Sequence, residues 1–121
     1  MKLKDIEVDF DFLDADDVER LEKESKIVLK KCEEEEKKEM SMAESIRKQC
    51  EIVNIFFDNV FGEKISEKLF KGKNNLREHL DLFEEIINAK KKEDTEIRRT
   101  YDRYQPNRET RRNNKYNKGR R

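Results

Sequence analysis

The chain has 121 residues and a mass of 14.7 kDa, which is enough for one small domain with a modest core. Charged residues make up 48% and hydrophobic residues 33%, with three glycines and one proline, a composition typical of a helical, strongly solvated protein. No apolar run approaches the roughly 20 residues of a membrane-spanning helix, and the acidic start MKLKDIEVDF lacks the apolar stretch of a secretory signal.

The formal net charge of zero conceals two parts of opposite charge. Residues 1–96 carry 19 Lys and Arg against 27 Asp and Glu, whereas residues 97–121 carry 10 against 2. Apolar periodicity fails after Ala89, and Pro106 opposes a continuing helix. We therefore expect an acidic helical domain over residues 1–96 and a basic, flexible, disordered tail over residues 97–121, with a fraying helix as the alternative for residues 90–104.

The first predicted element is a half-buried strand within residues 3–12. Apolar and acidic residues alternate strictly from Asp5 to Phe12, which places Ile6, Val8, Phe10 and Phe12 on one face. A lone strand leaves backbone groups unpaired, so this one needs a partner, either in a tight hairpin with Leu3 or on another subunit.

Two long helices follow. Asp14 is a suitable N-cap for a helix over residues 15–38, and Asp16 and Asp17 complement the positive end of its dipole. The sequence Ser41-Met42-Ala43-Glu44 matches a capping box, and apolar residues then recur every three or four positions until Gly62. These signals predict a second, more buried helix over residues 42–61.

Two further helices are predicted over residues 63–70 and 75–96. The first directs Ile65, Leu69 and Phe70 inward and ends at Gly72. The second is capped by Asn75, and its apolar stripe is Leu76, Leu80, Phe83 and Ile87, supported by Leu82 and Ile86. The predicted fold is therefore mainly α: a small bundle of three to four helices with a short N-terminal β-strand or hairpin.

Residues that carry catalysis or bind metals do not form a recognisable pattern. The three glycines are too far apart for a phosphate-binding loop, and one histidine with two separated cysteines does not make a zinc site. We expect Cys32 and Cys50 to be reduced, inert thiols and His79 to be a partly exposed helix residue. The sequence thus predicts no enzyme, no cofactor and no metal.

Binding is the remaining function, and two segments are candidates. In the acidic segment, Phe10 and Phe12 belong either to the core or to an exposed edge that pairs with another chain. In the tail, clustered basic residues with Tyr101, Tyr104 and Tyr116 suit contact with phosphates and bases, or attachment to an acidic protein surface such as that of a second copy.

Four segments follow one another along most of the chain: FLDADDVERLE, IFFDNVFGE, KLFKGKNNLREHLDLFEEII and the closing PNRETRR. In this order they resemble the tail assembly chaperone-like proteins of long-tailed phages and prophages of low-GC Gram-positive bacteria. The best matches are residues 14–22, 61–63, 69–76 and the pairs Asn107-Arg108 and Arg111-Arg112.

The resemblance implies a non-catalytic, self-associating factor in the cytoplasm of the bacterial host. Such a factor covers the long tape measure protein and recruits tail tube subunits during virion morphogenesis. In many members a ribosomal frameshift adds a further domain. The residues then expected to bind partners are Phe10, Phe12, Asp14, Asp16, Asp17, Arg108, Arg111 and Arg112. The alternatives are a nucleic-acid-binding regulator that uses the basic tail, which the acidic body disfavours, and a structural tail component.

Overall fold

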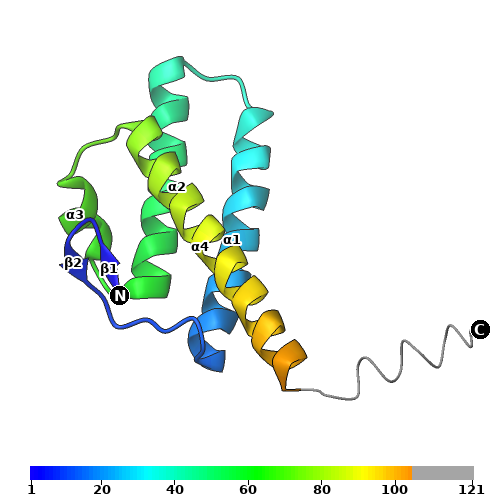
Figure 1. Cartoon of the computed structure of the whole chain (residues 1–121). Coiled ribbons are helices and arrows are strands. Elements are labelled where there is room, and N and C mark those ends of the chain that lie inside the picture. Colours follow the sequence, from blue (N-terminus) through cyan, green and yellow to red (C-terminus); the bar gives the residue numbers. More distant parts are fainter. Residues whose placement is uncertain (105–121) are drawn as a thin grey trace, which may run out of the picture. The chain divides into compact units, whose positions relative to one another are not determined.

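The computed structural model describes residues 1–104, which divide into two units, residues 1–86 and the part of the chain from residue 87 on. Its elements confirm the mainly α fold with a short N-terminal hairpin and four helices (Figure 1). In chain order they are β1 (Lys2–Leu3), β2 (Ile6–Glu7), α1 (Ala15–Glu36), α2 (Met42–Phe61), α3 (Ile65–Phe70) and α4 (Leu76–Arg103).

The N-terminal hairpin is much shorter than the strand expected over residues 3–12. β1 pairs with β2 in antiparallel register, Leu3 opposite Ile6, and the turn between them places Lys4 (φ 48°) and Asp5 (φ 72°) in the left-handed region. This pairing is the tight hairpin with Leu3 that was one of the two expected arrangements. The expected alternation of faces nevertheless continues past the strand, because Val8 and Phe10 are buried while Asp9 is exposed.

α1 and α2 form an antiparallel pair that lies side by side (Figure 1). The predicted caps are present: the Asp14 carboxylate accepts a hydrogen bond from the Asp17 amide at 3.0 Å, and the Ser41 hydroxyl accepts one from the Glu44 amide at 3.1 Å. α2 has the bounds predicted for it, whereas α1 ends at Glu36, two residues before the expected Lys38.

α3 begins at Ile65 because the chain reverses direction just before it. Gly62 has φ 138° and Lys64 has φ 61°, which interrupt the helical path that the sequence pattern predicted from residue 63. The Ser66 amide in the first turn of α3 has no acceptor within its own helix. It donates to the Asp58 carboxylate of α2 at 2.9 Å, and the Ser66 hydroxyl donates to the same carboxylate at 3.1 Å.

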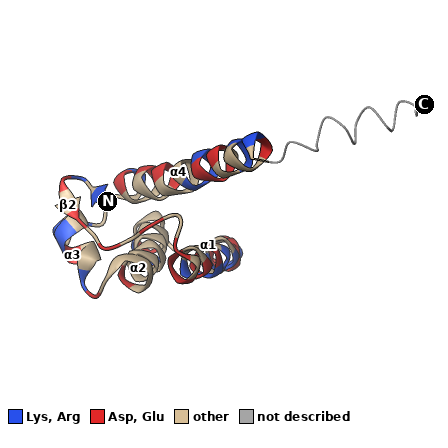
Figure 2. Cartoon of the chain, turned by 60° about the horizontal axis from the view of Figure 1, so that its bottom comes forward, with Lys and Arg blue, Asp and Glu red and all other residues tan. Residues whose placement is uncertain are grey.

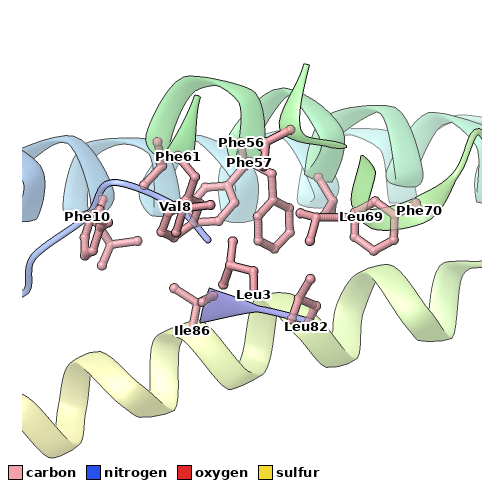
Figure 3. Packing of buried hydrophobic residues seen from close by; sticks show 14 of the residues in the cluster. Leu3, Val8, Phe10, Phe56, Phe57, Phe61, Leu69, Phe70, Leu82 and Ile86 are labelled. Carbon is pink, nitrogen blue, oxygen red and sulfur yellow. The ribbon is translucent and has the colours of Figure 1, made fainter. Parts of the chain in front are cut away.

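The core of the first unit is built around phenylalanines of α2. Phe56 and Phe57 are almost fully buried, and Phe57 contacts Phe61 and Phe70 at centroid distances of 5.8 and 5.7 Å. Figure 3 shows Leu3 of the hairpin between these rings and the first part of α4. The hairpin therefore closes the core, as do Leu82 and Ile86, which are 5% and 3% exposed.

The buried face of α4 differs from the predicted stripe. Leu80 is 38% exposed, whereas the buried residues in this helix are His79, Leu82 and Ile86. The prediction was wrong about His79 because it treated the imidazole as a polar surface group. Both ring nitrogens have hydrogen-bond partners inside the fold, so the ring can be buried. The buried face of α4 therefore includes His79 in place of Leu80.

The described part of the second unit, residues 87–104, is the continuation of α4. Ion pairs spaced along this stretch join Lys90 to Asp94 at 2.9 Å and Glu96 to Arg99 at 3.2 Å. The helix thus persists to Arg103, as the fraying-helix alternative allowed, and residues 97–103 are not part of an unstructured tail. Residues 105–121 lie outside the described part, and within residues 1–104 no helix is long and apolar enough to cross a membrane.

Candidate partner-binding surfaces

The two phenylalanines expected to bind partners lie against the core. Phe10 is 6% exposed and Phe12 is partly buried, and their rings meet edge to face at 5.0 Å. Phe10 also lies 5.0 Å from Phe61. These positions correspond to the core alternative given for the pair. A direct contact of either ring with a partner stays a prediction, and it would require the segment to move.

The aspartates at the start of α1 have local partners, with one exception. Asp14 caps the helix, while the Asp17 carboxylate accepts from the Asp11 amide at 2.9 Å and pairs with Arg20 at 2.7 Å. The hydrogen bond from the Asp11 amide, followed by that from Arg20, lowers the pKa of Asp17. Asp16 is exposed, so it is the carboxylate of this turn that most easily reaches a second molecule.

The remaining three residues predicted to bind partners are arginines, and the structure does not describe their positions. Arg108, Arg111 and Arg112 all lie in residues 105–121, outside the described part of the chain. Their contribution to partner binding therefore stays a prediction.

A groove lies between α1 and α2, which we call the α1–α2 groove. Its apolar wall is Ile52 and Ile55, and Ile55 is 43% exposed although it is a large aliphatic residue. Charged side chains of both signs surround this wall: Lys31, Glu34, Glu35, Lys48 and Glu51. With about 260 Å³ of space it is smaller than most clefts for small molecules, and its size suits one or two side chains of a partner.

Glu35 gives the α1–α2 groove an acceptor without a donor. Its Oε2 accepts from Lys38 at 2.7 Å, and its Oε1 is buried with no hydrogen-bond partner in residues 1–104. A buried oxygen without a donor is unfavourable, so this side chain lowers the stability of the fold at the groove.

A second surface lies where the hairpin, α3 and the start of α4 meet, and we call it the lysine corner. Figure 2 shows Lys and Arg gathered at this end, around β2 and α3. It encloses about 410 Å³, and its lining includes Lys4, Lys68, Lys71 and Lys73, with Glu78 and the aliphatic Ile6.

Lys4 is the anchored member of the lysine corner. Its ammonium donates to the Leu69 carbonyl at 3.1 Å and to the Glu78 carboxylate, and it lies 4.9 Å from the centre of the Phe70 ring. The hydrogen bond from Lys4 lowers the pKa of Glu78. Because this pair is neutral as a unit, the positive charge of the corner comes from the other three lysines.

Behind the lysine corner, the imidazole of His79 is stacked on Phe70 at a centroid distance of 3.7 Å and is 0% exposed. Its Nδ1 lies 2.7 Å from the Asn75 carbonyl oxygen and its Nε2 lies 2.9 Å from Oδ1 of Asn54. Burial lowers its pKa against the opposing effect of the Asn75 carbonyl. The ring is thus a packed support for the corner, with no access to a substrate.

Residues 1–104 contain no group of three or more His, Cys, Asp and Glu placed to hold a metal ion. Both cysteines are free, and burial raises the pKa of each thiol, which makes them poor nucleophiles. The two described surfaces present charged and apolar side chains.

Sequence reasoning missed both surfaces, although a signal for the lysine corner was present. Residues 68–77 contain four basic residues and no acidic one, inside a region that is acidic as a whole. For the α1–α2 groove the signal was Ile55, an aliphatic residue that falls off the stripe of buried positions in α2 and is 43% exposed.

Comparison with known proteins gives one match. No curated protein and no solved structure matches the chain. A family model matches residues 4–115, which is nearly the whole length. The chain belongs to the family described as Family of unknown function (DUF6673).

Proposed function

We propose that the protein is a non-catalytic assembly chaperone of long-tailed phages. It binds the tape measure protein and tail tube subunits in the cytoplasm of the bacterial host while tails are built. The sequence resemblance across most of the chain suggests this role. The structural observation that carries it is the α1–α2 groove, with its exposed Ile55 and charged margins.

The α1–α2 groove has the properties of a helix-binding surface. A tape measure protein is a long helical chain, and a helix is recognised by an apolar groove that accepts side chains at spacings of three and four residues. Ile52 and Ile55 provide the apolar contact. The margins carry both signs of charge, so they fix the orientation of a charged partner helix.

The test is coexpression of the full chain with the tape measure protein encoded beside it, followed by measurement of complex formation. Ile55→Lys places a charge on the apolar wall and should weaken binding roughly ten- to hundredfold, the equivalent of one lost aliphatic contact. Leu29→Lys is the matched control, because Leu29 is an aliphatic residue of α1 that is 64% exposed and does not line the groove. It should bind as the unaltered chain does.

Three results would contradict the proposal. They are a gene far from tail genes, no complex with either the tape measure or the tail tube protein, or equal binding by the Ile55 and Leu29 variants. Mass spectrometry of purified particles separates a chaperone, which is absent from them, from a structural component, which stays. Binding of nucleic acid that falls steeply with salt and is lost on deleting residues 97–121 would instead favour a regulator.

A further inference from the structure

Leu13 is an exposed aliphatic side chain in a fixed position. It is 70% exposed in the turn that precedes α1. The turn is held by two hydrogen bonds to Asp11: the Leu13 amide donates to its carboxylate at 2.8 Å and the Asp14 amide to its carbonyl at 3.0 Å. A large apolar side chain presented by an ordered turn is suited to contact with another surface.

The surroundings of Leu13 are strongly acidic. Residues 5–19 include eight acidic residues and no basic one. Asp9, Asp11, Asp14 and Asp16 are all exposed, so carboxylates lie on both sides of the leucine along the chain. We call Leu13 with these four aspartates the acidic knob.

The lysine corner has the complementary properties. Lys68, Lys71 and Lys73 are exposed, and none of them has an ion-pair partner within residues 1–104. Ile6 supplies an aliphatic wall, and the volume of about 410 Å³ is within the range of cavities that enclose a ligand group. The corner therefore suits an aliphatic side chain flanked by carboxylates, which is the chemistry of the acidic knob.

Figures 1 and 2 both show α2 between α3, which carries the corner, and α1, which begins two residues after Leu13. Leu13 therefore precedes the helix on the far side of α2 from the corner, which favours docking of the knob on another molecule. Residues 105–121 contain seven basic residues and one acidic residue, so the corner repels that segment instead of attracting it.

We propose that the acidic knob of one copy docks in the lysine corner of a second copy. Such a contact joins two different surfaces, so each copy keeps one free knob and one free corner, and further copies add head to tail. This arrangement deepens the proposed function, since repeated copies can cover a long partner. Its test needs only the purified protein, so either proposal can fail while the other stands.

The experiment is sedimentation velocity of the full chain over a range of protein and salt concentrations. For the unaltered chain, the average mass of the particles should rise with protein concentration and fall at high salt. The knob variant Leu13→Asp and the corner variant Lys68→Glu with Lys73→Glu should each associate at least tenfold more weakly. All of the substituted residues are exposed, and circular dichroism verifies that both variants stay folded.

Mixing the two variants provides the decisive measurement. The knob variant keeps an intact corner, and the corner variant keeps an intact knob, so equal amounts should form a one-to-one pair that does not grow further. Leu29→Asp and the pair Lys23→Glu with Lys30→Glu are matched controls on the exposed surface of α1, and they should associate as the unaltered chain does.

The proposal is overturned if the unaltered chain stays monomeric at all concentrations. It is equally overturned if either variant associates normally, or if the mixture of the two gives no pair.

Discussion

Protonation of His79 should destabilise the fold as the pH falls below neutrality. The imidazole is 0% exposed, stacked on Phe70, and it is the one histidine of the chain. Burial lowers its pKa in the folded state, while the unfolded chain titrates near the ordinary value of about 6.5. Between these two pKa values the unfolded state binds more protons than the folded state, so acid favours unfolding.

The magnitude follows from proton linkage. One group that is protonated only in the unfolded state reduces the free energy of unfolding by at most about 1.4 kcal/mol per pH unit. The charged neighbours of the ring are Lys4 and Glu78. The pKa of Glu78 is lowered by its hydrogen bond with Lys4, which keeps its titration below this pH window. The slope just below neutrality therefore belongs to His79.

A neutral imidazole also determines the orientation of the Asn54 amide. Nδ1 faces the Asn75 carbonyl oxygen and must donate to it, so Nε2 has no proton and must accept. The Asn54 amide group then presents its NH₂ to Nε2, which is the orientation opposite to the one with Oδ1 at 2.9 Å. An imidazolium would instead donate to both oxygens, and its pKa would be raised.

The assay is urea denaturation followed by far-UV circular dichroism at about pH 7.5, 6.5 and 5.5, values that bracket the ordinary histidine pKa. The unaltered chain should lose stability across the series, whereas His79→Gln should be less stable at the highest pH and nearly independent of pH. A gain in stability with acid would show a buried imidazolium and refute the reasoning. So would an unchanged slope in the glutamine variant.

Three further substitutions test the packing and the backbone, each by chemical denaturation. Phe57→Ala should lower the free energy of unfolding by about 3–5 kcal/mol, because the ring is 0% exposed and contacts three other aromatic rings. Asp14→Ala should lower the free energy of unfolding by about 1 kcal/mol, because the Asp17 amide loses its acceptor, whereas Asp14→Asn keeps an acceptor and should lower it much less. Gly62→Ala should cost about 1–3 kcal/mol from strain alone, since φ is 138° and no atom crowds the site.

Local signals predicted the long helices well. Ser41 and Glu44 mark the beginning of α2 and Gly62 marks its end, and all three act through atoms within a few residues of the helix terminus. The bounds of α2 could therefore be predicted from the sequence. The same applies to Asp14 at the start of α1 and to Asn75, which accepts from the Glu78 amide at 3.0 Å at the start of α4.

Errors arose where distant residues supply the interaction. The start of α3 depends on Asp58, which lies in the preceding helix and caps the Ser66 amide across a chain reversal. The burial of His79 depends on Asn54, which lies 25 residues away in α2. No local pattern contains these partners, so the sequence predicted too early a start for α3 and an exposed imidazole.

For charge, the error came from averaging over too long a segment. Averaged over residues 1–96 the domain is acidic, and that average assigned the positive surface of the protein to the tail. The local sequence carries the information, because Lys68, Lys71 and Lys73 lie within six positions and line one surface, while eight acidic residues lie within residues 5–19. The first unit therefore carries both complementary surfaces, and the docking proposed between copies does not require the tail. Because the arginines at 108, 111 and 112 have the same charge as the lysine corner, they would compete with it for the acidic knob.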